Sequence, residues 1–149
     1  MAAKAEMMRM RVTFCGHKDV DNRDLVKRWV TSVCRELIMQ GADEFFLGGY
    51  GGFDLLCASV LCELKETHPQ IRLVLVLPYL QNRICVEGYD ETVYPPLESV
   101  PKRFAISKRN EWMVQQSDIL VAYVIHSWGG ASKTLEYARR KKKRIISYE

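Results

Sequence analysis

Two glycine-rich turns in this sequence have the residue types and the spacing of an anion-binding site. The first is Gly48-Gly49-Tyr50-Gly51-Gly52 and the second is Gly129-Gly130-Ala131-Ser132-Lys133-Thr134. Each turn follows a short apolar run and precedes a stretch with helical character. A strand, a glycine turn and a helix in this order present several main-chain N–H groups to an anion. Phosphate is therefore the first ligand that the sequence suggests.

Side chains in and near these turns add further candidates. Ser132 and Thr134 would supply hydroxyls to a phosphate and Lys133 a positive charge, although Ser132 in a plain turn would simply cap the helix. His17 would contact phosphate or act as an acid, yet a single histidine at a turn is more often a surface residue. Asp54 would hydrogen-bond a ribose hydroxyl or cap the second helix.

The apolar pattern predicts the elements that position these residues. Strands are expected over residues 10–15, 44–47, 71–77, 119–125 and 144–148, and helices between residues 22 and 41, over 53–65, over 107–116 and from residue 131 or 132 onward. This alternation predicts an α/β fold: a three-layer domain with a mainly parallel five-stranded sheet and helices on both faces. Ligands of such sheets bind beyond the carboxyl ends of the strands, where both glycine turns would lie.

Residues 79–103 break this pattern with tyrosines and prolines, apart from a short helix expected around residues 81–86. Such a long connection inside a compact domain is typically a functional loop or a lid. We therefore expect this segment to border the site.

Length and composition narrow the class of protein. A chain of 149 residues, 48% hydrophobic, is expected to form one domain over residues 1–149. It contains no apolar run long enough for a membrane span and no apolar signal-peptide block, so we expect a cytoplasmic protein with no membrane partner. The five cysteines form no CxxC pair, and Cys15-Gly16-His17 has no second ligand pair. We expect neither a metal ion nor a cofactor.

The net charge of +4 is concentrated in a run of six cations from Arg139 to Arg144. Such a run would bind nucleic acid through counterion release. The alternative is a solvated helix end whose cations complement the helix dipole, and the lack of interleaved aromatic residues favours it.

Four segments in order carry a resemblance to a known family. They are Thr13-Phe14-Cys15-Gly16-His17, then Phe46-Leu47-Gly48-Gly49 with Gly52-Phe53-Asp54, then Arg109-Asn110-Glu111-Trp112-Met113-Val114 leading to Ser117-Asp118, and Gly129-Gly130 through Thr134 to Ala138. This ordered set resembles the SLOG superfamily, specifically its small YpsA-like members. The resemblance implies a Rossmann-like fold that binds nucleotides or nucleotide-derived molecules, with Arg109 and Asn110 as ligand contacts.

Relatives in the wider superfamily imply two alternatives. LOG phosphoribohydrolases cleave the N-glycosidic bond of a nucleoside monophosphate, and DprA-like proteins bind single-stranded DNA. The LOG signature P-G-G-x-G-T-x-x-E is not matched here, since Trp128 precedes the glycine pair and Glu136 follows Thr134 by two positions rather than three. In an N-glycosidic hydrolase Glu136 would be the leading catalytic carboxylate, with Asp54 and Asp118 behind it. The sequence leaves open whether the protein is an enzyme.

The sequence thus predicts a binding protein for a nucleotide-like small molecule, with phosphate held by both glycine turns. The predicted ligand-binding residues are Gly16, His17, Gly48, Gly49, Gly51, Gly52, Asp54, Arg109, Asn110, Gly129, Gly130, Ser132, Lys133 and Thr134. The resemblance and the apolar content also predict a homo-oligomer, with the number of subunits left open.

Overall fold

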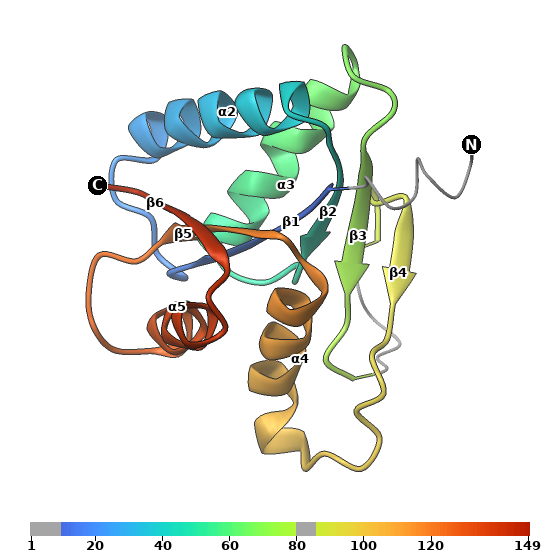
Figure 1. Ribbon diagram of the computed structural model, residues 1–149, viewed down its shortest axis with the longest axis vertical. Helices are drawn as coiled ribbons and strands as arrows, with labels where there is room; N and C mark the ends of the chain where they lie inside the picture. The colour runs from blue at the N-terminus through green and yellow to red at the C-terminus, as the bar shows by residue number, and fades with distance from the viewer. Residues whose placement is uncertain (1–9, 80–85) are drawn as a thin grey trace.

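A computed structural model describes residues 10–79 and 86–149 (Figure 1). Within these residues the strands are β1 (Met10–Gly16), β2 (Ala42–Leu47), β3 (Arg72–Val76), β4 (Glu91–Val93), β5 (Ile119–Tyr123) and β6 (Arg144–Ser147). The helices are α2 (Arg23–Met39), α3 (Gly52–Lys65), α4 (Lys102–Gln116) and α5 (Gly130–Arg140).

All strand pairs are parallel, in the order β4-β3-β2-β1-β5-β6. The chain builds outward from β1 to β4 on one side and then returns to place β5 and β6 on the other. The strand order therefore reverses between β1 and β5. In open parallel sheets such a reversal leaves a crevice at the carboxyl ends of the two strands.

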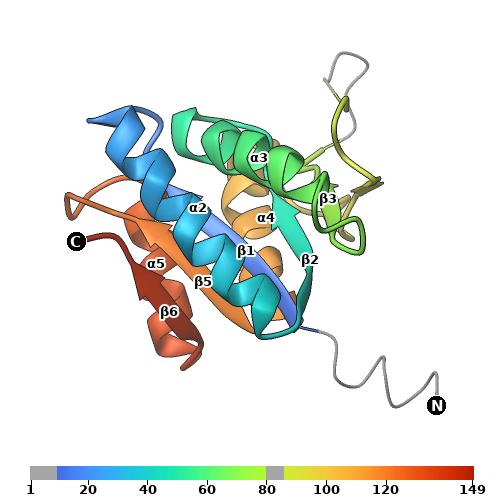
Figure 2. The same cartoon turned by 90° about the horizontal axis from the view of Figure 1, so that it is seen from above.

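Helices cover both faces of the sheet, as Figures 1 and 2 show: α2 and α3 pack on one face, and α4 and α5 on the other. Alternate residues of β1 serve the two sides, because successive strand side chains point to opposite faces. Val12 and Phe14 join the core beneath α2 and α3, whereas Cys15 packs with Val114 of α4 and Leu135 of α5. The predicted three-layer Rossmann-like α/β fold is confirmed.

The sheet has six described strands rather than the predicted five. The additional strand, β4, lies within the stretch that the sequence indicated as irregular, and it pairs with β3 through three residues. The helix expected over residues 81–86 falls almost entirely outside the described residues. The fourth helix begins at Lys102 rather than near Ser107, because Pro101 occupies its N-cap position and already accepts a hydrogen bond from the Phe104 amide.

No helix among the described residues is long and apolar enough to cross a lipid bilayer.

Candidate functional site

A cavity of about 590 Å³ lies at the carboxyl ends of β1 and β5, where the strand order reverses. We call it the site pocket. Four segments line it: the end of β1 with the loop after it, the first glycine turn, α4, and the segment from Ile125 to Thr134. The two glycine turns therefore meet at one edge of the sheet.

The site pocket gathers most of the predicted ligand-binding residues. Those that line it are Gly16, His17, Gly48, Gly51, Asp54, Arg109, Asn110, Gly129, Gly130 and Thr134. Those that do not are Gly49, Gly52, Ser132 and Lys133, together with Glu136. The binding role of each of these residues stays a prediction.

The main-chain donors of the first glycine turn are used by the protein itself. The Gly49 N–H donates to Oδ2 of Asp54, and the Gly52 N–H donates to the Lys18 carbonyl at 2.7 Å. The Phe53 N–H donates to the His17 carbonyl at 3.3 Å. The carboxylate of Asp54 thus takes the place in this turn that the sequence assigned to phosphate.

Close packing explains two glycines, Gly16 at the end of β1 and Gly52 in the first glycine turn. A Cβ at Gly16 would lie 2.2 Å from the ring of Phe53, and one at Gly52 would lie 2.4 Å from the Lys18 carbonyl oxygen. Both glycines let the loop after β1 approach the start of α3. Their role in the structure is to bring two walls of the site pocket together.

Arg109 ties α4 to the carboxyl ends of β2 and β3. Its side chain is buried, and Nη1 donates to the carbonyls of Gly48 at 3.1 Å and Val76 at 2.8 Å. Nε donates to Oδ1 of Asn110 at 2.9 Å. The guanidinium lies directly beneath the first glycine turn, since a Cβ on Gly48 would fall 2.9 Å from its Cζ.

Asp54 and Arg109 form the charged floor of the site pocket. Burial raises the pKa of Asp54, while the N–H groups of Gly48, Gly49 and Tyr50 and the charge of Arg109 act in the opposite direction. Burial likewise lowers the pKa of Arg109, and the charge of Asp54 opposes that shift. Each charge thus offsets part of the desolvation penalty of the other.

Three stacked rings form an aromatic wall on the opposite side of the pocket. The ring of His17 stacks on His126 with centroids 3.6 Å apart, and His126 stacks on Trp128 at 3.9 Å. Trp128 is 69% exposed, and Tyr50 on the first turn is 70% exposed, so both present open aromatic surface at the pocket. The sequence reasoning selected only His17 of these residues. His126 and Trp128 could have been selected from the sequence on one ground: they lie between the end of a predicted strand and the second glycine turn.

His17 is held as a neutral ring. Its Nε2 accepts a hydrogen bond from the Ile125 N–H at 2.8 Å, which places the ring proton on Nδ1. Burial, and after it the charge of His126, lowers the pKa of His17. Nε2 therefore cannot act as the proton donor that the sequence suggested, because it carries no proton and accepts the Ile125 N–H.

In the part of the chain that the structure describes, the first two N–H groups of α5 are unused, whereas those of α3, on Gly52 and Phe53, donate to carbonyls of the loop after β1. Gly129 is the N-cap, with φ at +95°, and no side chain caps the helix. The first intrahelical bond runs from the Lys133 N–H to the Gly129 carbonyl at 3.2 Å. Among the described residues, nothing accepts the N–H groups of Gly130 and Ala131, which line the site pocket.

The candidate catalytic carboxylates lie in three different places. Glu136 is on the exposed side of α5, where its side chain is 58% exposed and pairs with Arg139 at 3.1 Å. Asp118 lies at the amino end of β5, where it accepts the Arg11 N–H at 2.9 Å. Asp54 is the one of the three that lines the site pocket.

The last part of the basic run, from Lys141 to Arg144, lies at the opposite edge of the sheet from the site pocket, whereas Arg140 lines a cavity beside that pocket. Arg139 and Arg140 close α5, and Arg144 begins β6 beside the start of β5. The ammonium of Lys143 donates to the Ser117 carbonyl at 2.9 Å, and Nη1 of Arg144 donates to Oε1 of Gln40 at 3.2 Å. Part of this run therefore stabilises the fold itself.

In the described part of the chain, no group of three or more His, Cys, Asp or Glu side chains is placed to hold a metal ion.

The fold and its cavity define a Rossmann-like α/β protein with a ligand-sized pocket at the reversal of strand order. The family model for YpsA, described as the YspA SLOG family, matches residues 12–148. The chain belongs to this family, which confirms the resemblance seen in the sequence.

Curated relatives carry the name UPF0398 protein. One from Halalkalibacterium halodurans is 33% identical over 118 residues, which cover 70% of this chain and 62% of the relative. One from Bacillus thuringiensis is 22% identical over 140 residues, covering 84% of this chain and 74% of the relative. The chain thus spans less than two thirds of the length of the more similar of these two relatives.

Solved structures with the same fold include DNA processing protein A from Helicobacter pylori, described by its single-stranded DNA binding mode. That match has a TM-score of 0.65 and 16% identity, and covers 97% of this chain and 67% of the other. The molybdenum cofactor carrier protein of Chlamydomonas reinhardtii matches with a TM-score of 0.62 and 14% identity, covering 93% of this chain and 76% of the other. At these identities the likeness shows the fold alone.

Proposed function

We propose that this protein binds a nucleotide or a nucleotide-derived small molecule in the site pocket. The observation that carries the proposal is the meeting of open aromatic faces and unused main-chain donors in one cavity. Its volume of about 590 Å³ lies within the range of roughly 300–1,000 Å³ that is usual for small-molecule sites.

The base would stack on the aromatic wall. Trp128 is supported from behind by His126 and His17, so its exposed ring offers a surface that is already ordered. Stacking of a base on an aromatic side chain contributes about 1–3 kcal/mol and tolerates any base. This arrangement supports a nucleotide without selecting its base.

The phosphate would bind at the start of α5. The N–H groups of Gly130 and Ala131 open into the pocket, and the positive end of the helix dipole lies at the same point. The first glycine turn is a weaker candidate, because it already surrounds the carboxylate of Asp54. The proposal thus assigns the phosphate to the second turn and a supporting role to the first.

The structural neighbours agree with binding of a small molecule or of nucleic acid. One is named for its single-stranded DNA binding and the other as a carrier of a cofactor. We transfer to this chain only the coarser idea that this fold presents a ligand site.

Calorimetric titration with nucleoside monophosphates, nucleoside diphosphates and ADP-ribose tests the proposal. We expect binding of at least one ligand, and at least a tenfold loss of affinity in Trp128→Ala, in line with the stacking energy. Met39→Ala removes another exposed apolar side chain, 81% exposed at the end of α2, and serves as the matched control. Absence of heat with every ligand would overturn the proposal.

An N-glycosidic hydrolase is the second candidate. One observation favours it, with Asp54 rather than Glu136 as the catalytic carboxyl group. Asp54 places a carboxyl group in the pocket, and its raised pKa suits a proton donor. Chromatographic detection of free base released from a nucleoside monophosphate would establish this activity. Loss of turnover in Asp54→Asn with normal turnover in Glu136→Gln would assign the reaction to the pocket.

A further inference from the structure

A second cavity, of about 610 Å³, lies between α4 and α5 beside the site pocket. We call it the α4–α5 groove. Ile106 and Asn110 of α4 and Gly130 and Thr134 of α5 line both cavities. Because the two cavities share these residues, they lie side by side at the start of α5.

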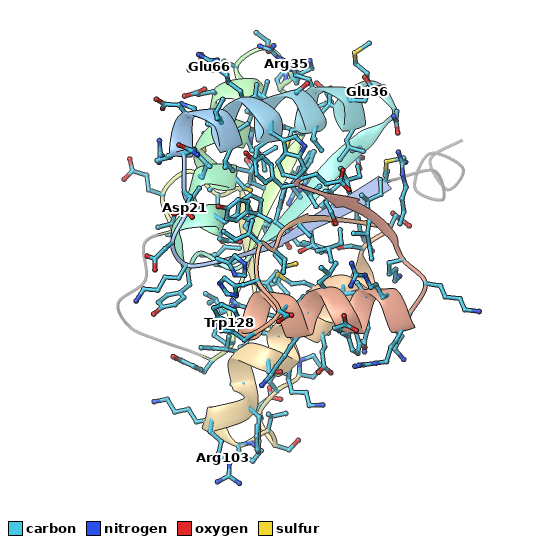
Figure 3. All side chains as sticks on the ribbon, turned by 90° about the vertical axis from the view of Figure 1, so that its left-hand side faces the viewer. Asp21, Arg35, Glu36, Glu66, Arg103 and Trp128 are labelled. Carbon is cyan, nitrogen blue, oxygen red and sulfur yellow. The ribbon has the colours of Figure 1, made fainter. Side chains whose placement is uncertain are left out.

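The cations of the groove lack carboxylate partners within the described part of the chain. Arg103 lies in the first turn of α4, whereas Lys133 and Arg140 belong to α5, and none of the three makes an ion pair with a described residue. Figure 3 shows Arg103 at the end of α4 that lies below α5, and Trp128 beside the start of α5. Three cationic residues therefore line this hollow.

The carboxylates that line the same groove are already engaged. Glu111 pairs with Lys108 at 3.4 Å, and Glu136 pairs with Arg139 at 3.1 Å. Neither of these two partner cations lines the groove. The charge left for a ligand is therefore positive, and the hydroxyls of Ser107 and Ser132 add neutral hydrogen-bond donors.

We propose that the α4–α5 groove binds a phosphate group beyond the first one, so that the ligand of this protein carries a chain of at least two phosphates. This inference rests on the proposed function, because it extends the ligand of the site pocket. A phosphate chain that leaves the pocket at Gly130 would pass the start of α5 near Lys133 and enter the positive field of Arg103 and Arg140. Its negative charge would offset the mutual repulsion of these cations.

Calorimetric titration with adenosine and guanosine 5′-mono- and diphosphates at 150 mM salt tests the inference. We expect the protein to bind a diphosphate at least tenfold more tightly than the matching monophosphate. Arg103→Ala/Arg140→Ala should reduce this preference to about twofold or less, and leave monophosphate affinity within about twofold of the unsubstituted protein. The double variant Lys102→Ala/Lys141→Ala loses the same charge from exposed neighbours outside the groove, and should keep the preference.

The outcomes separate the two proposals. Equal affinity for mono- and diphosphates, or a parallel loss of both in the groove variant, would overturn the groove proposal and leave the site pocket as a nucleotide site. Absence of binding by all four nucleotides would overturn both. Far-ultraviolet circular dichroism of the two double variants checks that each keeps the fold.

Discussion

Arg109 stabilises the floor of the site pocket through buried hydrogen bonds to main-chain carbonyls. Its buried guanidinium faces the carboxylate of Asp54 and donates to the carbonyls that follow β2 and end β3. Arg109→Met would leave the carbonyls of Gly48 and Val76 without this donor and Asp54 without a nearby positive charge; an unsatisfied buried polar group typically costs about 1–3 kcal/mol. We expect a loss of free energy of unfolding of this size, measured by urea denaturation.

A neighbouring substitution provides the control for this prediction. Lys108→Met removes an exposed cation one position earlier on α4, and should change stability by less than about 0.5 kcal/mol. Adding Asp54→Asn to Arg109→Met should restore part of the loss, because the carboxylate then no longer lacks a partner. Additive effects of the two substitutions would show that the charges do not interact.

His17 makes the stability of the protein sensitive to mildly acidic pH. Burial lowers the pKa of His17 in the folded state. As the pH falls through about 6.5, this residue therefore takes up a proton in the unfolded chain but not in the folded one. Stability is therefore complete above about pH 6.5 and falls as the pH drops below that value. The expected loss at pH 5.5 is at most about 1.4 kcal/mol from this group.

His17→Gln isolates this contribution, since the glutamine carbonyl can accept the Ile125 N–H while carrying no charge. Urea denaturation at pH 7.5 and pH 5.5 should show a larger decrease for the unsubstituted protein than for the variant. His68 and His126 are present in both proteins. Identical decreases in the two proteins would refute a lowered pKa at His17.

At the scale of single residues, the sequence predicted which residues gather at one edge of the sheet better than it predicted their contacts. His17, Asp54 and Arg109 were predicted to line the ligand site, and the structure brings them to one pocket. The hydrogen-bond partners of these side chains could not be predicted from the sequence. Neither spacing nor residue type shows that the Asp54 carboxylate accepts a hydrogen bond from the Gly49 N–H of the preceding turn. Trp128 stood out only as a departure from a motif, although it supplies the most exposed ring of the aromatic wall.

The helix α5 depends on glycine at its N-cap through backbone conformation alone. A Cβ would meet no atom within 4 Å at either Gly129 or Gly130, but Gly129 has φ at +95° and ψ at 178°. Side chains other than glycine avoid this region at a cost of about 1–3 kcal/mol. Gly130 is the first residue of the helix, where the preference for alanine over glycine is smaller than the roughly 0.5–1 kcal/mol of a helix interior.

These adjacent positions should therefore respond in opposite directions. We expect Gly129→Ala to lower the thermal midpoint and Gly130→Ala to raise it slightly, as measured by circular dichroism. The comparison needs no correction for steric contact, because both sites open to empty space. A rise in both midpoints would show that Gly129 does not need its positive φ.

Helices and strands with a regular pattern of apolar residues could be predicted from the sequence. An element that forms only because it pairs with a neighbouring strand could not. The buried strand β3 and the amphipathic helix α2 agree with their predicted ranges to within two residues at most ends. The strand β4 is only three residues long, and its residues are exposed or half-buried, so it has no apolar period to detect. It exists because β3 offers an unpaired edge that its backbone completes.

At the scale of the whole molecule, the two edges of the sheet differ in character. The carboxyl edge holds the site pocket, which has exposed aromatic rings and the unused N–H groups of Gly130 and Ala131. The amino edge is joined by polar contacts of the protein with itself, such as those of Asp118 with Arg11, Lys143 with Ser117, and Arg144 with Gln40. This asymmetry follows from the parallel strands, which place every loop that leaves a strand at the same edge.

The separation of the edges predicts that Lys141 and Lys142, the exposed cations of the basic run that do not line the α4–α5 groove, act independently of the site pocket. The five residues of β5 span about 16 Å, which is roughly two screening lengths at physiological salt. Lys141→Glu/Lys142→Glu reverses two exposed charges and spares Lys143 and Arg144, which stabilise the fold. We expect nucleotide affinity at 150 mM salt to stay within about twofold in this variant, as measured by calorimetry.

If the run also binds single-stranded oligonucleotides, fluorescence anisotropy should show weaker binding and a shallower salt dependence in the variant. A greater than fivefold loss of nucleotide affinity would instead mean that the field of the run reaches the carboxyl edge of the sheet.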